Sequence, residues 1–286
     1  MKISKSYHID QLRDYSTLFT RREVNRWFKS DLSSINLKIN RYDVEFIDGS
    51  KTYLSYLKHI YRILERFYPN EYVYKNELIN KWLIDELGTS DSIVYNEFRL
   101  GNAVADLAMF NGVSKAFEIK TILDKDARLH SQITEYHKLF NEVYIIVPET
   151  RLDNYINLYP DVGIVIFRNS NKGFELAKPA TAIKCIEIEP LMQTLHTHEY
   201  IFMVEEYYGE RPLFNDFNKF DICKKLIEKI PQNTLNDLFI TTMKKRKVNN
   251  EFSKREKQLN QIFLSLNLSQ VQQAQLLSNL RLNITI

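Results

Sequence analysis

The stretch IVYNEFRLGNAVADLAMFNGVSKAFEIK, residues 93–120, decides the fold of this 286-residue chain. Apolar and polar residues alternate through most of it, which is the period of a β-strand. The pairs Gly101-Asn102 and Asn111-Gly112 interrupt the alternation and are typical of hairpin turns. We therefore expect three consecutive strands, over Ile93–Leu100, Ala103–Phe110 and Val113–Lys120.

Helical patterns flank these strands. Apolar residues at helical spacing predict helices over Lys51–Phe67, about Val73–Leu87 (closed by Gly88) and Asp126–Phe140. The apolar runs Val143–Val147 and Val162–Phe167 predict strands buried on both faces. Further helices are expected over Arg151–Leu158 and, toward the C-terminus, over residues 191–207, 221–230, 235–245 and 252–282. The order of these elements indicates an α/β fold.

The composition is that of an ordinary globular protein. Apolar residues make up 44% and charged residues 26%, with seven Gly and seven Pro, which excludes disordered and collagen-like chains. Two cysteines, Cys185 and Cys223, are too few for a disulfide framework or a zinc ribbon. No apolar run approaches the ~18 residues of a membrane-spanning helix, and the first residues show no signal-peptide core. We expect a cytoplasmic protein with no membrane partner.

Strand register decides which polar side chains of the three strands meet. With Gly101-Asn102 as a two-residue turn, Leu100 pairs with Ala103. Counting outward from that pair places Glu97 opposite Asp106. Like charges that face each other destabilise a sheet unless a cation lies between them or one pKa is raised.

The second turn allows two registers. A strict two-residue loop pairs Asp106 with Phe117, whereas a three-residue loop with Gly112 in the left-handed conformation sets Asp106 opposite Glu118. We expect the longer loop, because it gathers the apolar residues of the strands on one buried face. That face would hold Phe98, Leu100, Ala105, Leu107, Met109, Phe117 and Ile119.

The other face would hold Glu97, Asp106, Glu118 and Lys120, a group suited to hydrolysis of a phosphodiester. Oxygen ligands from Asp106 and Glu118 are typical of Mg²⁺ or Mn²⁺ sites, with Glu97 as a further ligand or as a support for the ligands. A bound ion lowers the pKa of water and neutralises phosphate charge, while Lys120 orients the nucleophile or stabilises the transition state. The alternative interpretation is a set of scattered charges on an exposed sheet edge.

These residues carry a resemblance to a known superfamily. Asp106, then Glu118-Ile119-Lys120 across a hairpin, then Arg128 on the following helix, resemble the PD-(D/E)XK nucleases, although Ala105 stands where the motif's name has proline. Gln132 to Tyr136 is similar to the QxxxY element of the RecB-like branch. More narrowly, residues 93–147 are similar to a family of small bacterial and phage-borne proteins of this fold, in which a mostly helical C-terminal region follows the core.

The resemblance implies a restriction-endonuclease-like αβββαβ core with helical additions at both ends. We place an N-terminal extension at residues 1–50, the core at 51–180 and a mostly helical C-terminal region at 181–286. The last helices would either pack on their own core or form the interface of a homodimer or of a complex with a protein partner.

The resemblance also implies roles for individual residues. Asp106 and Glu118 would hold the metal ion with the backbone carbonyl of Ile119, and Lys120 would assist the attack on phosphorus. Independently of the resemblance, helix spacing places Gln132, Tyr136 and, one turn earlier, Arg128 on one face, from which all three would reach the rim of the site. Tyr136 also fits the apolar stripe of this helix, so a packing role is the alternative for it. The identity of an additional acid stays open: the cross-strand count favours Glu97, while many members of the superfamily place a glutamate on the preceding helix, where this chain offers Glu65, Glu77 and Glu86.

Basic residues concentrate near the C-terminus. Residues 224–286 contain 11 Lys or Arg against 4 Asp or Glu, a net charge of +7, whereas the rest of the chain carries −4. Such a segment indicates either contact with a polyanion or a solvated helix face. In the first case, non-specific phosphate contacts would come from Lys244, Lys245, Arg246, Lys247, Lys254 and Arg255.

The predicted function is therefore metal-dependent hydrolysis of phosphodiester bonds in nucleic acid, DNA above all, with Mg²⁺ or Mn²⁺ as the cofactor. The rival hypothesis is a protein of the same fold that has no catalytic activity and binds nucleic acid or protein in a phage, mobile-element or defence system. The presence of Asp106, Glu118 and Lys120 together favours the enzyme.

Overall fold

The computed structural model describes residues 7–47, 51–84, 92–168 and 173–285. The chain forms two compact units, one of residues 1–80 with 249–286 and the other of residues 81–248. The predicted boundaries, after residues 50 and 180, differ from these. The reason is that the first and last segments of the chain share one hydrophobic core, so neither end is a separate addition.

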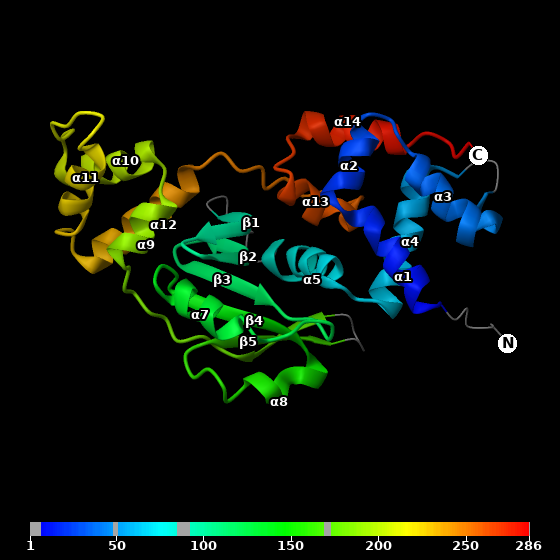
Figure 1. Ribbon diagram of the computed structural model, residues 1–286, viewed down its shortest axis with the longest axis horizontal. Helices are drawn as coiled ribbons and strands as arrows, with labels where there is room; N and C mark the ends of the chain where they lie inside the picture. Colours follow the sequence, from blue (N-terminus) through cyan, green and yellow to red (C-terminus); the bar gives the residue numbers. More distant parts are fainter. Residues whose placement is uncertain (1–6, 48–50, 85–91, 169–172, 286) are drawn as a thin grey trace. The chain divides into compact units, whose positions relative to one another are not determined.

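The unit of residues 81–248 contains a six-stranded mixed sheet in the order β1-β2-β3-β4-β5-β6 (Figure 1). The first three strands are antiparallel, β3, β4 and β5 are parallel, and β6 returns antiparallel to β5. Their bounds are β1 Ile93–Leu100, β2 Ala103–Phe110, β3 Ser114–Ile119, β4 Glu142–Pro148, β5 Gly163–Arg168 and β6 Gly173–Lys178. Five of these strands agree with the sequence patterns, and β6 was not predicted.

Both hairpin turns have the predicted loop lengths. Leu100 pairs with Ala103 across the two-residue turn. Phe110 pairs with Ser114, which leaves a three-residue loop in which Gly112 has a φ of 93°. Leu107, and not Asp106, is the partner of Phe117, so the register of the three-residue loop is confirmed.

The prediction that one face gathers all the apolar residues of these strands is wrong. Ile93, Tyr95, Phe98 and Leu100 all belong to one core cluster, so the alternation changes phase between Tyr95 and Phe98. The cause is Glu97, whose φ of 53° interrupts the extended backbone of β1. A matching change occurs in β2, and four residues of the predicted apolar face lie outside the cluster although they are buried: Leu107, Met109, Phe117 and Ile119.

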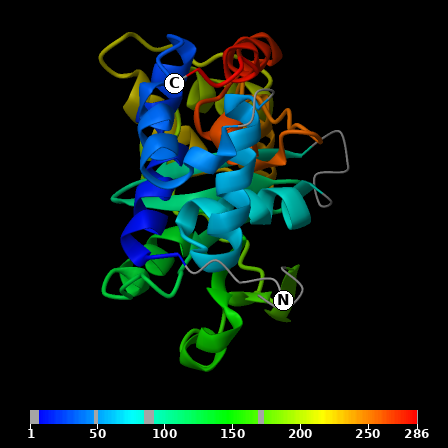
Figure 2. The same cartoon turned by 90° about the vertical axis from the view of Figure 1, so that its right-hand side faces the viewer.

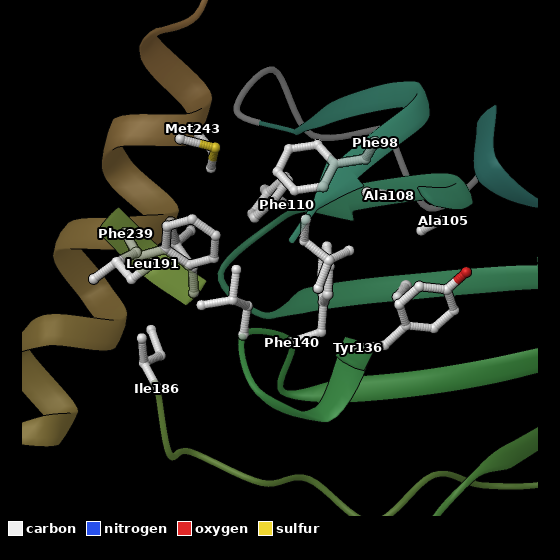
Figure 3. Packing of buried hydrophobic residues seen from close by; sticks show 14 of the residues in the cluster. Phe98, Ala105, Ala108, Phe110, Tyr136, Phe140, Ile186, Leu191, Phe239 and Met243 are labelled. Atoms are coloured by element: carbon white, nitrogen blue, oxygen red, sulfur yellow. The ribbon is translucent and has the colours of Figure 1, made fainter. Parts of the chain in front are cut away.

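Helix α7 (Leu129–His137) lies on the face of the sheet that holds this cluster (Figure 1). It is shorter than the predicted Asp126–Phe140. Phe140 packs against the sheet residues Phe98 and Phe110. Figure 3 shows Tyr136 nearer to Ala105, with Phe239 closing the cluster from a later helix. The rings of Phe110 and Phe239 meet edge to face at 5.5 Å, a favourable aromatic geometry.

The remaining helices of this unit follow the strands. After β4 come the short η4 (Glu149–Arg151) and α8 (Leu152–Tyr155), which cover the start of the predicted helix over Arg151–Leu158. After β6 come four helices that account for the patterns predicted up to residue 245. They are α9 Ile188–Thr194, α10 Thr197–Tyr208, α11 Lys219–Ile227 and α12 Gln232–Lys245.

The other unit is helical. Its helices are α1 Ile9–Ser16, α2 Arg21–Phe28, α3 Ser33–Tyr42, α4 Tyr53–Phe67, α5 Glu71–Leu78, α13 Asn260–Ser265 and α14 Gln270–Leu280, with the 3-10 turns η1 Thr17–Phe19, η2 Val44–Phe46 and η5 Lys257–Leu259. The predicted helix over Lys51–Phe67 is confirmed by α4. A π-helical turn, η3 (Ile79–Leu83), follows α5, and the predicted cap Gly88 lies outside the described residues.

The C-terminal helices complete the core of the helical unit. Leu276 and Leu280 of α14 are fully buried in the cluster that also holds Trp27 of α2. Both views show the red α14 beside the blue α2 (Figures 1 and 2). The predicted helix over residues 252–282 is in fact broken, because Asn267 has a φ of 51° and Ser269 begins α14 with a capping box. Packing of these helices on the chain's own core is therefore observed, and a homodimer or protein partner stays a prediction.

Among the described residues, no helix is both long enough and apolar enough to cross a bilayer.

Candidate functional site

Glu118 is the centre of a buried polar cluster at the end of β3. Its side chain is almost fully buried, and both carboxylate oxygens have partners. Lys120 Nζ donates to Oε1 at 2.8 Å, and the hydroxyl of Tyr136 lies 2.6 Å from Oε2. Glu118 lies in β3, Lys120 directly follows that strand, and Tyr136 belongs to α7. The fold therefore brings three of the predicted site residues together.

Gln132 joins the same cluster from α7. Its Oε1 accepts from Lys120 Nζ at 3.3 Å, and its Nε2 donates to the Tyr136 hydroxyl at 3.4 Å. Residues four apart on a helix share a face, which is why the sequence spacing placed this pair correctly. The single hydroxyl proton of Tyr136 has a second acceptor within reach, the carbonyl oxygen of Val104 at 2.9 Å.

The tyrosine hydroxyl of this cluster is a permanent hydrogen-bond donor. Burial, and then the neighbouring charge of Glu118, raise the pKa of Tyr136 far above its usual value. Tyr136 therefore keeps its proton throughout the working pH range and remains available to donate to the Glu118 carboxylate.

Tyr136→Phe should lower the free energy of unfolding by about 1–3 kcal/mol, because it leaves a buried carboxylate oxygen without its donor. Urea denaturation of the variant measures this loss. Tyr207→Phe, which removes a hydroxyl from a half-exposed ring on α10, is the matched control and should change stability by less than about 0.5 kcal/mol. Equal stability of the two variants would show that the Tyr136 hydroxyl does not support Glu118.

Asp106 lies beside this cluster where β2 and β3 part. The ladder between the two strands ends at Leu107 and Phe117. Beyond that point the carboxylate of Asp106 takes the place of a backbone acceptor, since the Ile119 N–H donates to its Oδ2 at 2.8 Å. The charge of Asp106 also acts on the Tyr136 hydroxyl. Asp106, Ile119 and the Glu118 cluster thus occupy one place in the fold.

Glu97 does not complete a three-carboxylate group with Asp106 and Glu118. Within the described residues, no three His, Cys, Asp or Glu side chains are placed to hold a metal ion together. The cross-strand count itself agrees with the register, since the pairs Asn96–Leu107 and Phe98–Ala105 flank the Glu97–Asp106 position. The count does not give the face on which the Glu97 side chain lies. It assumes a regular alternation of side chains, and the left-handed backbone at Glu97 breaks that alternation.

The glutamates that compete with Glu97 do not belong to the described part of the sheet unit. Glu65 and Glu77 belong to the helical unit, where the Tyr61 hydroxyl donates to Glu77 at 2.5 Å. Glu86 lies outside the described residues.

The loop after Lys120 is held by a residue that the sequence patterns did not single out. Arg151 donates to the Thr121 carbonyl at 2.7 Å and to the Asp126 carboxylate at 2.7 Å. Asp124 accepts from the backbone and hydroxyl of Thr121, both at 2.7 Å, which closes the loop on itself. Because Arg151 lies 30 residues beyond Thr121, no local motif could have indicated its position.

The predicted phosphate-binding residues fall into different environments. Arg246 is committed to an ion pair within its own unit: it donates to both carboxylate oxygens of Glu199, at 2.5 and 2.7 Å, and to the Thr194 carbonyl at 3.0 Å. Lys245 Nζ lies 3.7 Å from the centre of the Phe202 ring. A further pair, Lys254 and Arg255, is exposed but belongs to the helical unit, so the basic stretch is divided between the two units. Arg128 is exposed and provides the N-cap backbone of α7.

A family comparison covers most of the chain and all of the residues of the cluster. The family described as Bacteriophage P4 protein cII matches residues 65–270. The chain belongs to this family. A curated relative, protein cII of Enterobacteria phage P4, is 26% identical over 171 residues, which is 58% of this chain and 64% of the relative. The match therefore spans less than two thirds of that P4 cII protein.

One solved structure shows a weak likeness to this P4 cII family member. It is a protein of unknown function from Silicibacter pomeroyi, with 14% identity, a TM-score of 0.33, and coverage of 49% of this chain and 94% of that protein. A likeness at this level supports no conclusion about fold or function. The phage family agrees with the phage setting implied by the sequence resemblance, and its printed name assigns no chemistry.

Proposed function

We propose that this protein is a metal-dependent nuclease of the PD-(D/E)XK type that hydrolyses phosphodiester bonds, above all in DNA. One observation carries the proposal: Glu118, Lys120, Gln132 and Tyr136 form a continuous hydrogen-bonded cluster, with Asp106 bound to the next backbone amide along β3. These are the residues that the superfamily motif requires. A restriction-endonuclease-like core is part of the same proposal, because the six-stranded mixed sheet fits several α/β folds.

The donor set fits Mg²⁺ or Mn²⁺. Asp106, Glu118 and the Ile119 carbonyl offer oxygen ligands only, which these hard cations prefer. When bound, the ion would supply a water of lowered pKa and would neutralise charge on the phosphate. Lys120, whose ammonium group lies 2.8 Å from Glu118, would donate to the substrate.

Each side chain of the cluster has a task in this proposal. Lys120 places a positive charge where negative charge develops on the phosphate oxygens. Gln132 and Tyr136 hold Lys120 and Glu118 in position through one hydrogen bond each, which preserves the geometry of the reacting groups. Arg151 fixes the loop that leaves the site directly after Lys120.

The test is cleavage of linear and circular duplex DNA, single-stranded DNA and RNA with Mg²⁺, Mn²⁺ or EDTA. Metal-dependent products are expected from the wild type. Lys120→Ala should lower the rate by about 10²–10³-fold, the effect typical of removing one donor to a developing charge. Lys184→Ala, at a lysine outside the cluster, is the matched control and should cut like the wild type.

The second candidate function is a nuclease-fold protein without catalytic activity that binds nucleic acid or protein. The observation in its favour is that both oxygens of Glu118 are already engaged, by Lys120 and Tyr136. No cleavage by the wild type under any metal condition, with nucleic-acid binding unchanged in Lys120→Ala, would select this alternative.

A further inference from the structure

Two consecutive helices of the helical unit, α13 and α14, are joined by a short turn (Figure 1). The turn consists of residues 266–269, and its second residue, Asn267, has a φ of 51°. Asparagine is one of the few residues besides glycine that adopt this left-handed backbone routinely. Leu268, in the same turn, is buried in the core of the unit. A turn of three or four residues with one left-handed position is typical of the helix-turn-helix motif.

The two helices differ in how much of their surface meets solvent. Residues 260–264 of α13 are all buried, so this helix lies inside the unit. Helix α14 buries only one face, through Leu276, Leu277 and Leu280. In a DNA-binding helix-turn-helix, the second helix of the motif enters the major groove and reads the bases. The exposed face of α14 is available for such a contact.

The exposed face of α14 carries amide and small side chains. Its members are Gln270, Val271, Gln272, Ala274, Gln275 and Ser278. Helix α14 contains no charged residue, whereas a helix face that only meets water usually carries Lys, Arg, Asp or Glu. Val271, which is 78% exposed, lies on one stripe with Gln275 and Ser278 at i, i+4 and i+7. Glutamine amides bind the edge of adenine through two hydrogen bonds, and apolar side chains contact the methyl group of thymine.

This face is ordered before any ligand arrives. A capping box joins Ser269 and Gln272 at the start of α14. The Gln273 amide then donates to the Leu268 carbonyl at 3.1 Å, and Asn279 donates to the Trp27 carbonyl of α2 at 2.9 Å. A helix that is already fixed loses little conformational entropy when it binds.

A segment with exposed cations, residues 249–256, runs along α14. At one end Asn249 donates twice to Asn267 in the turn, at 2.6 and 2.7 Å. At the other end Glu256 lies 3.3 Å from Arg281, the residue directly after α14. The exposed cations of this segment are Lys254 and Arg255.

Another exposed cation, Lys29, directly follows α2. The Asn279 amide of α14 donates to the Phe28 carbonyl at 3.3 Å, which places Lys29 beside the same helix. The segment of residues 249–256 also contains one exposed acid, Glu251, whose backbone carbonyl accepts from Gln273 on the buried side of α14. Cations around an uncharged helix face match the phosphates that border a DNA groove.

We propose that α13 and α14 form a DNA-binding helix-turn-helix, with α14 in the major groove of duplex DNA. Gln270 and Gln275 bind the edges of adenine, and Val271 contacts the methyl group of thymine. The phosphate contacts come from Lys29, Lys254 and Arg255. The inference does not rest on the Glu118 cluster, because all of these residues belong to the helical unit. It adds sequence-specific recognition of A·T pairs to the proposed function.

The test is selection of binding sites by the full chain in EDTA, where no cleavage occurs. The probe is a pool of DNA duplexes with a random core of about 20 base pairs. We expect a common motif with A·T pairs to be enriched, and the enriched duplex should bind at least about 10-fold more tightly than a scrambled duplex. Gln275→Ala should weaken binding to the enriched duplex about 10-fold and leave the scrambled duplex unaffected. Gln193→Ala, at an exposed glutamine of α9 in the other unit, is the matched control and should bind like the wild type.

The phosphate contacts have a separate measurement. Because each lost phosphate contact reduces the salt dependence of binding, Lys254→Ala/Arg255→Ala should lower the slope of log affinity against log salt by about 2. This double variant should weaken binding to the enriched and the scrambled duplex alike. An unchanged slope would contradict the phosphate contacts of Lys254 and Arg255.

The outcomes also separate this inference from the proposed nuclease. The recognition helix would be overturned if no motif is enriched, or if Gln275→Ala binds the enriched duplex as the wild type does. Tighter binding of duplex RNA would overturn it too, since the deep, narrow major groove of RNA does not admit side chains. Sequence-specific binding by a wild type that cuts no DNA would support α14 as the recognition helix and would count against the nuclease.

Discussion

Asp106→Asn should abolish metal-dependent cleavage, with a loss of at least about 10³-fold, and should also abolish stabilisation of the protein by Mg²⁺. The amide keeps the size of the carboxylate and keeps an oxygen that can accept from the Ile119 N–H, so the local backbone should persist. What it removes is the negative charge that a divalent cation requires. A metal ion contributes several kcal/mol of charge stabilisation in such reactions, and each 1.36 kcal/mol is tenfold in rate.

Thermal melting in EDTA and in Mg²⁺ provides a measurement that does not depend on catalysis. A ligand that binds only the folded state stabilises it by about 2.7 kcal/mol at 100 times its Kd. The wild type should therefore melt at a higher temperature in Mg²⁺, and Asp106→Asn should melt at the same temperature in both buffers. Asp153→Asn, at an exposed aspartate of α8, is the matched control and should retain the shift. A full Mg²⁺ shift in Asp106→Asn would show that Asp106 is not a ligand of the proposed metal site.

Local signals in the sequence were sufficient for much of the candidate site. The three-residue loop at Gly112 follows from the residue type, since a φ of 93° favours glycine. The spacing of Gln132 and Tyr136 follows from the 3.6-residue period of a helix. These features depend on neighbours in the chain, and for that reason one sequence predicted them.

The side-chain position of Glu97 could not be obtained in the same way. Its left-handed backbone is tolerated because the surrounding strand pairs and core fix it, and no residue type near it indicates such a conformation. Because the alternation changes phase at this one residue, Leu107 and Met109 of the neighbouring strand also lie on the face opposite to the predicted one. A period-two count is reliable only as far as the backbone stays extended.

The division into units also lay beyond the sequence patterns. Leu276 and Leu280 show the periodicity of a buried helix face, but periodicity does not say which core the face covers. They pack in one cluster with Trp27, which lies near the opposite end of the chain. The prediction of separate N- and C-terminal additions therefore followed chain order, whereas burial of apolar surface joined the two ends.

Glu118→Gln should destabilise the sheet unit by about 3–5 kcal/mol, more than the loss expected for Tyr136→Phe. Lys120 Nζ lies 2.8 Å from Glu118, and the two side chains are only 10% and 4% exposed. Glutamine has nearly the same volume, so packing survives while the buried ammonium group loses its counter-charge. The oxygen of Gln132, at 3.3 Å, is a neutral partner and cannot replace it. Hydrogen exchange of peptides from β3 and α7 measures the loss, and peptides from α4 in the helical unit serve as the internal control.

The double variant Glu118→Gln/Lys120→Met decides whether charge is the cause. Removing both members of a buried ion pair is often close to neutral, because the cost of desolvating the two charges disappears together with their attraction. We therefore expect the double variant to exchange much more slowly than Glu118→Gln alone and to approach the wild type. If the two variants exchange equally fast, the loss arises from the Tyr136 hydrogen bond to Glu118 and not from Lys120. In that case the charge of Lys120 would not contribute to the stability of the fold, and its role would be to contact the substrate.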